Sequence, residues 1–383
     1  MKDSKESRTI FIILTTQCNL RCKYCYEVNK SPQTIDVDEV IINLCDDIDK
    51  SKDSFNDFTV VFHGGEPFLE FELMKRIAET LYERYKDISL MCSATTNGTI
   101  LTDEIRKWLV ANKHRFVCTL SLDGGRVTHN KMRCNSYDKI DRQFFKETWP
   151  YQPVKMTISP DTLPTMYDNI VELYDEGFEV NPSLACEVLW NIDRDMPILE
   201  RELAKLITYY VEHPDKQPGK LVDISPIVFS PYNTVPHNRA CGAGTNIITF
   251  DVKGHKYPCH AFISDFSHTI TYNQVVIDGL FHDLNTKNGL ELSPKCKGCY
   301  AYPACSPCYG LNYTKRHSMS EFDSNMCAII KIRIAAAAKM YSLMLLSSNP
   351  RSYLPLKNKT DTEMANMIAG IIALQKITNN APV

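Results

Sequence analysis

The chain has 383 residues, and its 43 basic and 46 acidic side chains give a net charge of −3. This near-neutral balance gives no electrostatic reason to expect a nucleic-acid partner or binding to an anionic membrane surface. A hydrophobic share of 44% and a charged share of 23% exclude disorder for the bulk of the chain.

The first half of the sequence alternates short β-rich runs with helical patterns. Six runs are predicted to be strands: Thr9–Leu14, Phe58–His63, Ser89–Thr95, Phe116–Leu122, Val154–Ile158 and Glu179–Leu184. Helical periodicity lies between them, over Asp38–Ile48, Glu72–Tyr85, Asp103–Ala111 and Thr165–Tyr174. This α/β alternation implies a parallel sheet, and the count fits a partial (β/α)6 TIM-like barrel as readily as a doubly wound sheet. In both architectures ligands bind beyond the carboxyl ends of the strands.

The character of the sequence changes after about residue 220. Residues 205–223 favour a helix followed by a Pro/Gly linker, and seven cysteines fall between Cys241 and Cys327. A stretch with so little periodicity and so few apolar residues is expected to be held together by metal. We therefore predict three parts: a barrel domain over residues 1–220, a cysteine-rich domain over 221–348 and a C-terminal helical tail over 349–383.

No targeting segment or membrane span is expected. The first eight residues are highly charged, and the apolar run Thr9–Leu14 is too short for the core of a signal peptide. The longest apolar stretch, Ala328–Leu346, is interrupted by three basic residues and favours an amphipathic helix. We expect a cytoplasmic protein, in which clustered cysteines more often bind metal than form disulfides.

Three cysteines follow the first predicted strand in the spacing C-x3-C-x2-C, namely Cys18, Cys22 and Cys25. Three thiolates hold three irons of a 4Fe–4S cube and leave the fourth iron open, whereas a structural cluster takes four cysteines. An open iron is what a cluster needs if it is to bind and act on a substrate. The alternative from the spacing alone is a zinc site that a distant residue completes.

A second motif, His63-Gly64-Gly65-Glu66-Pro67, ends the second predicted strand. Adjacent glycines let the backbone approach a ligand closely, and the Glu66 carboxylate is a suitable partner for a cationic amino group. Such a turn by itself is commonly just a loop. Its position at the same sheet end as the cysteine loop agrees with the expected place of a ligand.

These motifs resemble those of the radical S-adenosylmethionine (SAM) enzymes. The resemblance covers roughly residues 9 to 185, and its motifs follow successive strands. They are the Cys18/Cys22/Cys25 loop, Gly64–Pro67, Thr96–Gly98, Ser121–Gly124 and His129–Arg133 (HNKMR), where relatives often have H-D-x-x-R. The combination is highly specific, although each of the later motifs alone is weak.

In that family the open iron binds the amino and carboxylate groups of SAM. The resemblance implies a SAM-binding set at the strand ends: Tyr24, Gly64, Gly65, Glu66, Asn97, Ser121 and Ser159. Glu66 would support the amino group and Tyr24 would pack near the adenine, whereas the Asn and Ser residues could equally be turn caps. The implied chemistry is release of a 5′-deoxyadenosyl radical, which abstracts a hydrogen from the substrate.

The cysteine-rich segment resembles a SPASM domain, a twitch-type extension that holds two auxiliary 4Fe–4S clusters in radical SAM enzymes that modify peptides. Its C-x2-C-x5-C-x2-C core alone suits a zinc ribbon about as well. By the resemblance, Cys241, Cys259 and Cys308 serve the first auxiliary cluster. The second auxiliary cluster takes the other four cysteines: Cys296, Cys299, Cys305 and Cys327. The two-residue spacer between Cys305 and Cys308, where relatives commonly have three residues, departs from the pattern.

Two cubes fully ligated by cysteine need eight thiolates, and this segment offers seven. Some relatives have an eighth cysteine shortly before the position of Cys241, but residues 230–240 contain none. The alternatives are His237 as a ligand, Cys186 arriving from the barrel, or an open iron that binds a substrate thiolate. Three of the remaining cysteines lie in apolar elements and are expected to be buried: Cys45, Cys92 and Cys118.

The leading hypothesis is a radical SAM oxidoreductase that matures a ribosomal precursor peptide (a RiPP maturase) by forming a thioether or carbon–carbon cross-link. Its expected cofactors are SAM and three 4Fe–4S clusters, and its expected reductant is a flavodoxin or ferredoxin. Anaerobic sulfatase maturases, which oxidise Cys or Ser to formylglycine, share the architecture but typically carry an Asp base where this chain has His260. Histidine also takes a proton near neutral pH, so His260 is the candidate catalytic base. The alternative is that His260 only hydrogen-bonds a cluster sulfur or a carbonyl.

A non-catalytic iron–sulfur carrier or a zinc scaffold is the alternative of another class. It does not explain why the three-cysteine loop and the Gly-Gly-Glu turn share one sheet end. Peptide maturases often carry an N-terminal leader-binding domain, and the 17 residues before Cys18 leave no room for one. Precursor capture is therefore expected from a separate leader-binding protein, from the cysteine-rich domain or from the tail after Asn349.

Overall fold

The structure is a computed structural model that describes residues 6–27, 30, 32–186, 188–222, 241–263, 272–285, 293–296, 299, 301, 305 and 308–379. All six predicted strands are present within a few residues of their expected limits. They are β1 (Glu6–Thr15), β2 (Phe55–Gly64), β3 (Ser89–Thr96), β4 (Phe116–Leu120), β5 (Val154–Ile158) and β6 (Val180–Leu184).

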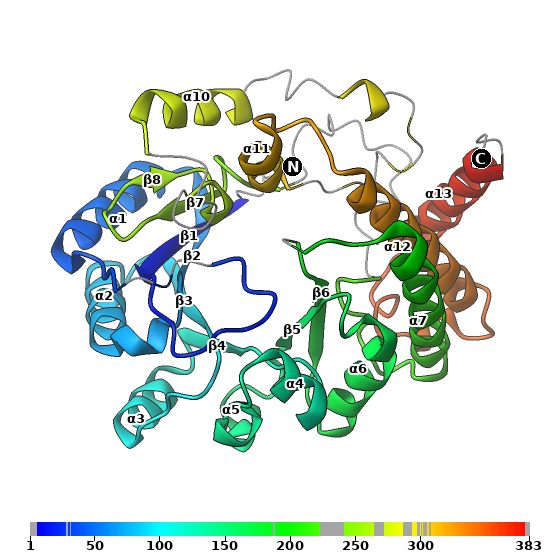
Figure 1. Cartoon of the computed structure of the whole chain (residues 1–383), viewed down its shortest axis with the longest axis horizontal. Helices are drawn as coiled ribbons and strands as arrows, with labels where there is room; N and C mark the ends of the chain where they lie inside the picture. The colour runs from blue at the N-terminus through cyan, green and yellow to red at the C-terminus, as the bar shows by residue number, and fades with distance from the viewer. Residues whose placement is uncertain are drawn as a thin grey trace.

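The strands follow one another in space as they do in the sequence. β1 to β4 pair in parallel in chain order, β5 pairs in parallel with β6, and a bridge between Ser121 and Lys155 joins the two sheets. This order excludes the doubly wound alternative, in which the strand order reverses at a switch point. Figure 1 shows the strands around an open centre with the helices outside, so the partial TIM-like barrel is confirmed.

The helices between the strands bury one apolar face against the sheet. The four predicted here are α1 (Val37–Ser51), α2 (Phe71–Arg84), α3 (Asp103–Asn112) and α6 (Met166–Asp175). Leu44 and Ile48 of α1 are fully buried in the same core as Ile10 and Ile12 of β1. The Asp36 side chain begins α1 by accepting hydrogen bonds from two backbone N–H groups of its first turn.

Several helices differ from the sequence prediction. The short helices α4 (Arg126–Met132) and α5 (Arg142–Thr148) were not predicted, because each offers only two turns of periodicity. The helix expected to begin at Lys205 is α7 (Ile192–Glu212), which begins much earlier and continues through Pro197. The predicted amphipathic helix after Ala328 lies within α12 (Ser324–Leu345), which packs along α7.

The cysteine-rich segment contains more regular structure than expected. β7 (Ile247–Phe250) pairs in parallel with β1, and β8 (Lys256–Tyr257) pairs antiparallel with β7, so both strands extend the barrel's own sheet. Among the described residues after β8, α10 (Gln274–Asn285) and α11 (Tyr309–Arg316) precede α12, and α13 (Asp361–Asn379) lies in the tail. The domain limits at residues 220 and 348 remain a prediction.

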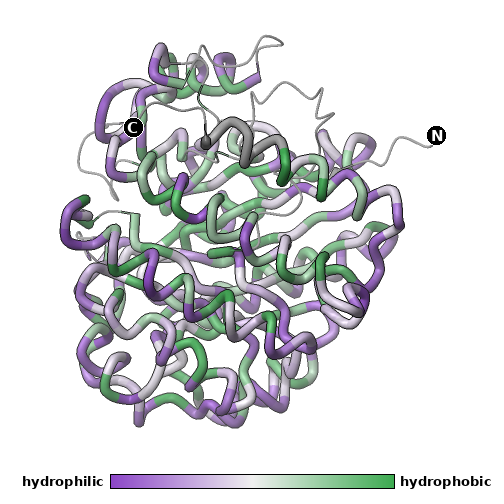
Figure 2. The backbone as a smooth tube through the Cα atoms, turned by 90° about the vertical axis from the view of Figure 1, so that its right-hand side faces the viewer, coloured by the Kyte–Doolittle hydropathy of each residue, from purple (hydrophilic) through white to green (hydrophobic). Residues whose placement is uncertain are grey.

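The hydrophobic core lies between the barrel strands and the surrounding helices. Polar and apolar segments alternate along the backbone in Figure 2. None of the helices in the described ranges is both long enough and apolar enough to span a bilayer.

Candidate active site at the carboxyl ends of the strands

The three-cysteine loop follows β1, and its thiols are all partly exposed. Backbone hydrogen bonds fold the loop, from Cys25 N–H to Cys22 O at 3.1 Å and from Lys23 N–H to Met132 O at 3.0 Å. Burial raises the pKa of the Cys22 thiol to about 11, and the neighbouring Cys25 and Cys18 thiolates raise it further. A bound metal reverses this preference, because thiols that coordinate metal are deprotonated.

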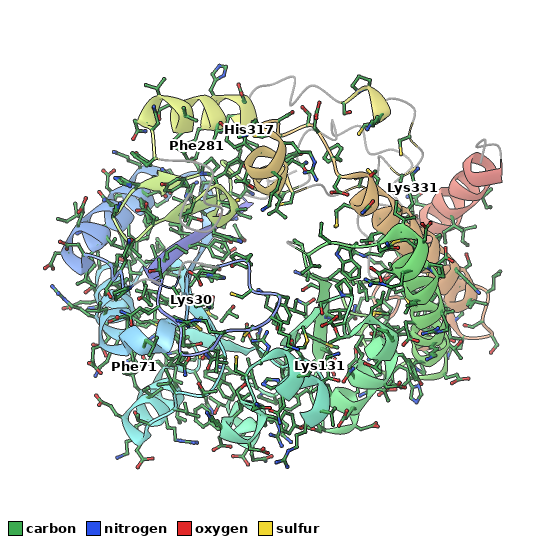
Figure 3. The ribbon with its side chains drawn as sticks, in the orientation of Figure 1. Lys30, Phe71, Lys131, Phe281, His317 and Lys331 are labelled. Carbon is green, nitrogen blue, oxygen red and sulfur yellow. The ribbon has the colours of Figure 1, made fainter. Side chains whose placement is uncertain are left out.

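Lys30 places a positive charge beside this loop. Its Nζ lies 3.5 Å from Cys25 Sγ, and Figure 3 shows Lys30 inside the ring of strands. Burial lowers the pKa of Lys30, but the nearby Cys25 and Cys18 thiolates outweigh burial and raise it overall. Lys30 thus stays charged and offsets the negative charge of the thiolates.

The paired glycines after β2 are explained by close backbone packing. A Cβ atom on Gly65 would lie 1.8 Å from Gln17 O, and one on Gly64 would lie 2.2 Å from Thr15 O. Gly64 also has a φ of +136°, which favours glycine. The glycines therefore let the turn after β2 lie directly against the start of the cysteine loop, and their contact with SAM stays a prediction.

The Glu66 carboxylate forms its hydrogen bonds with other residues of the protein. It is 1% exposed and accepts hydrogen bonds from Thr96 Oγ1 at 2.7 Å and from Asn97 N–H at 2.8 Å. Burial raises its pKa to about 7 against the opposing effect of these donors. Asn97 in turn donates from Nδ2 to Asn19 Oδ1 of the cysteine loop at 2.8 Å. Glu66 and Asn97 thus position the turns around the cysteine loop.

A buried ion pair between Arg133 and Asp123 holds Tyr24 in place. The sequence analysis did not predict this pair. The Tyr24 hydroxyl donates to Asp123, whose carboxylate also accepts from Arg133 Nε at 2.7 Å and from Thr157 N–H at 3.0 Å. Asp123 and Arg133 are both buried. The only sequence signal was their place in the Ser121–Gly124 and His129–Arg133 motifs.

Three polar residues come from β5 and from the turns after β4 and β5: Lys155 lies in β5, Ser121 follows β4 and Ser159 follows β5. Ser121 bridges to Lys155 through the backbone, and Ser159 is 4% exposed. Ser159 Oγ is buried without a hydrogen-bond partner among the described residues, as a ligand-binding hydroxyl would be. Burial lowers the pKa of Lys155, and the Arg133 guanidinium lowers it further. This buried cation favours an anionic ligand group, such as a carboxylate.

His260 lies against two barrel residues, His63 of the Gly-Gly-Glu motif and Phe11, which no motif had singled out. Its ring stacks on His63 of β2 with centroids 5.4 Å apart, and it contacts Phe11 of β1 at 5.3 Å. Burial lowers the pKa of His260 to about 4, and the Lys155 charge lowers it further. His260 Nδ1 is buried without a partner among the described residues. The ring is therefore neutral at pH 7 and has a nitrogen available to accept a proton.

The C-terminal cysteines influence one another's pKa values within the two groups that the resemblance implies. The pKa of Cys259 is raised by burial and by the charges of Cys308 and Cys241, which form the first group with it. Burial raises the pKa of Cys305 to about 12, with additional effects from the other members of the second group: Cys327, Cys296 and Cys299. The short Cys305–Cys308 spacer separates the groups. Their role as cluster ligands stays a prediction.

Within the described ranges, no three His, Cys, Asp or Glu side chains converge as the ligands of a single metal ion do. A 4Fe–4S cube binds each thiolate through a different iron, so its ligands stand farther apart than those of one ion. Of the alternatives for the missing eighth ligand, His237 lies outside the described residues and Cys186 is exposed after β6. Cys45, Cys92 and Cys118 are buried, as predicted.

Comparison with known families gives the family of the barrel. Residues 12–143 match the Radical SAM superfamily. The barrel of this chain therefore contains a radical SAM domain. Membership implies SAM and one 4Fe–4S cluster, and the three part-exposed thiols, Lys30 and the unpartnered Ser159 hydroxyl fit them.

Curated relatives of the radical SAM chain include two clostridial proteins. A cysteine-type anaerobic sulfatase-maturating enzyme of Clostridium perfringens is 30% identical over 145 residues, which cover 34% of this chain but only 38% of that protein. The enzyme of the same name from Clostridium novyi is 25% identical over 325 residues, covering 76% of this chain and 84% of that protein.

A third relative is a bacteriocin biosynthesis protein. The antilisterial bacteriocin subtilosin biosynthesis protein AlbA of Bacillus subtilis is 24% identical over 343 residues, covering 83% of this chain and 70% of that protein. Among solved structures, native anSMEcpe with bound AdoMet and Cp18Cys peptide superposes with a TM-score of 0.65 at 18% identity. It covers 88% of this chain and 98% of that chain, and shows a shared fold.

Proposed function

We propose that this radical SAM enzyme is a maturase that uses two auxiliary 4Fe–4S clusters to install a thioether or carbon–carbon cross-link in a ribosomal precursor peptide. One observation carries the proposal: both cysteine regions meet at the same end of the barrel. The ring of Tyr26, the residue after Cys25 of the SAM loop, lies with its centroid 6.4 Å from that of His260, the residue after Cys259 of the first C-terminal group. A substrate bound there lies between the source of the radical and an electron acceptor.

The proposed reaction balances for a thioether as follows. When bound, SAM and its reduced cluster supply a 5′-deoxyadenosyl radical, which removes one hydrogen atom from a substrate carbon. The C–H and S–H bonds break and a C–S bond forms, so one thiol proton and one electron must also leave. His260 is the acceptor of the proton, because its Nδ1 is buried without a hydrogen-bond partner among the described residues. The first cysteine group would hold the cluster that accepts this electron, and a flavodoxin or ferredoxin would take the electron from it.

Neighbouring side chains prepare the site for this chemistry. The Tyr24–Asp123–Arg133 network fixes the side of the cysteine loop that faces β4, and the stack of His260 on His63 fixes the imidazole plane. Phe11, whose ring centroid lies 5.3 Å from that of His260, limits access of water to the imidazole.

Sulfatase maturation is the second candidate. It is favoured by the Clostridium novyi relative, whose similarity extends over 76% of this chain. The residue after Cys259 is His260 rather than the Asp expected for that reaction, but a neutral histidine accepts a proton as well.

The test is anaerobic reconstitution with iron and sulfide, followed by dithionite and SAM. Formation of 5′-deoxyadenosine is expected, and Cys18→Ala/Cys22→Ala/Cys25→Ala should form none. Mass spectrometry then compares a cysteine-rich precursor peptide encoded beside this gene with a sulfatase-derived cysteine peptide. Loss of two hydrogens with retention of sulfur supports cross-linking, and formylglycine supports the second candidate. Absence of 5′-deoxyadenosine from the unmodified enzyme would overturn both.

A further inference from the structure

Lys30 lies beside the loop that carries the three barrel cysteines. Its Nζ is 3.5 Å from Cys25 Sγ, and Figure 3 shows Lys30 inside the ring of strands. The nearest acidic residue along the chain, Glu27, is 3% exposed, and its Oε1 has no hydrogen-bond partner among the described residues. Glu27 therefore does not pair with Lys30, and the Cys25 sulfur is the only hydrogen-bond partner of the ammonium within the described ranges.

The three sulfurs of the loop differ in their hydrogen-bond donors. Cys18 Sγ accepts from a neutral backbone N–H at 3.4 Å, and within the described part of the chain no donor reaches Cys22 Sγ. Cys25 Sγ accepts from Lys30 and, as a free thiol, donates to a backbone carbonyl at 3.7 Å. Binding to iron removes the thiol proton and with it the second contact. The contact with Lys30 becomes stronger, because the acceptor is then a thiolate.

The other two basic side chains of the loop do not contact these sulfurs. Arg21 is exposed, and its Nη1 donates to the carbonyl oxygens of Cys18 and Leu20 at 2.6 and 3.0 Å. Lys23 is also exposed, and among the described contacts only its backbone N–H forms a hydrogen bond, to Met132 O at 3.0 Å. Water and salt screen both of these charges, whereas Lys30 is half-buried and directly against a sulfur.

A cation in this place favours the reduced form of a cluster bound to the loop. Reduction adds one electron, and therefore one negative charge, to the irons and their thiolates. Hydrogen bonds to the ligand sulfurs and the charge around them set the reduction potential of an iron–sulfur cluster. An ammonium 3.5 Å from one of three ligand sulfurs stabilises the additional negative charge, so its effect is to raise the potential.

We propose that Lys30 raises the reduction potential of the SAM-binding cluster, an inference that rests on the SAM chemistry of the proposed function but not on its cross-link. A flavodoxin or ferredoxin supplies one electron, which the cluster accepts. Lys30 keeps its proton throughout, and no covalent bond forms or breaks. Lys30 acts through the Cys25 sulfur, so it is a positioning residue rather than a catalytic one.

The test is a redox titration of the reconstituted full chain without SAM, read by electron paramagnetic resonance. The signal that remains in Cys18→Ala/Cys22→Ala/Cys25→Ala belongs to the auxiliary clusters and is subtracted. At a fixed potential, Lys30→Met should lower the ratio of reduced to oxidised SAM-binding cluster about tenfold, which corresponds to about 59 mV for one electron. The iron content should stay unchanged, because no ligand is removed.

Three further variants keep the result interpretable. Lys23→Met removes the same charge from an exposed position of the same loop and should change the ratio less than about twofold. Lys30→Arg, which keeps the charge and a donor, should restore most of the ratio. Equal ratios in Lys30→Met and Lys23→Met would overturn the inference while leaving the proposed function intact.

Iron content separates the remaining outcomes. Loss of iron from both Lys30→Met and Lys30→Gln would overturn the inference, because Lys30 would then be needed to assemble the cluster rather than to set its potential. Absence of a reducible SAM-binding cluster from the unmodified chain would overturn the inference and the proposed function together.

Discussion

The two cysteine-bearing regions are held in different ways. In the barrel, hydrogen bonds to Met132 and Asn97 and close packing against Gly65 fix the cysteine loop. In the second C-terminal group, the backbone hydrogen bonds among the described residues are local, such as Cys299 N–H to Cys296 O at 3.1 Å. The barrel therefore builds its site before any metal binds, whereas the second group depends on metal for its structure.

Removal of iron is the strongest test of this contrast. Anaerobic chelation should abolish amide protection around Cys296–Cys327 and leave β1 to β4 protected, because an apolar core holds the strands. Hydrogen exchange read by mass spectrometry measures both regions in one sample. The matched control is Cys18→Ala/Cys22→Ala/Cys25→Ala, which should keep protection in the C-terminal segment. Equal loss of protection in the two regions would show that the barrel depends on metal as much as the second C-terminal group does.

A second test measures how much the buried Asp123–Arg133 ion pair contributes to the stability of the barrel without metal. Asp123→Asn leaves the buried Arg133 guanidinium without its carboxylate, and should lower the free energy of unfolding by about 3–5 kcal/mol in urea. The control is Asp138→Asn, which breaks the exposed ion pair with Arg126 and should change that free energy by about 0.5 kcal/mol or less. Similar losses in the two variants would show that the buried pair does not support the barrel.

The sequence predicted the barrel better than the elements that complete it. The strands were found because apolar residues alternate along them, and burial of Phe58, Val60 and Phe62 in β2 shows that alternation. β7 was not found, because four residues carry too little pattern and its pairing partner β1 lies more than 200 residues away.

The same limit applies to the site. Cysteine spacing located the loop after β1, since the ligands of a cluster are close in sequence. The cysteine spacing gave no indication of Lys155 or His63. These residues act on His260 because the fold brings β2, β5 and the segment after β8 together. The glycines of the Gly-Gly-Glu turn were expected from ligand approach, and the structure gives them a packing reason as well.

A third test uses pH within the barrel. Burial lowers the pKa of His129 to about 4, below its value of about 6.5 in an unfolded chain. The unfolded chain therefore binds the proton first, and stability is lost as the pH falls from about 6.5 towards 4. Between pH 7 and pH 5 this loss amounts to about 2 kcal/mol. His129→Gln should flatten this part of the stability profile, whereas His282→Gln, on an exposed position of α10, should not.

The smallest expected effects come from substitutions at two glycines, one in the barrel and one in the C-terminal segment. An added Cβ atom would meet nothing within 4 Å at either position. Gly177, after α6, has a φ of +87° and nothing within 4 Å of an added Cβ, so Gly177→Ala should destabilise the barrel by about 1 kcal/mol. Gly279 in α10 has the same free space without a positive φ, so Gly279→Ala should stabilise that helix by about 0.5–1 kcal/mol. If the regions are held separately, hydrogen exchange should show the second change in α10 and not in β1 to β4. An increase in protection in both α10 and β1 to β4 would mean that the two regions unfold as one unit. Their stability would then not differ in its dependence on iron.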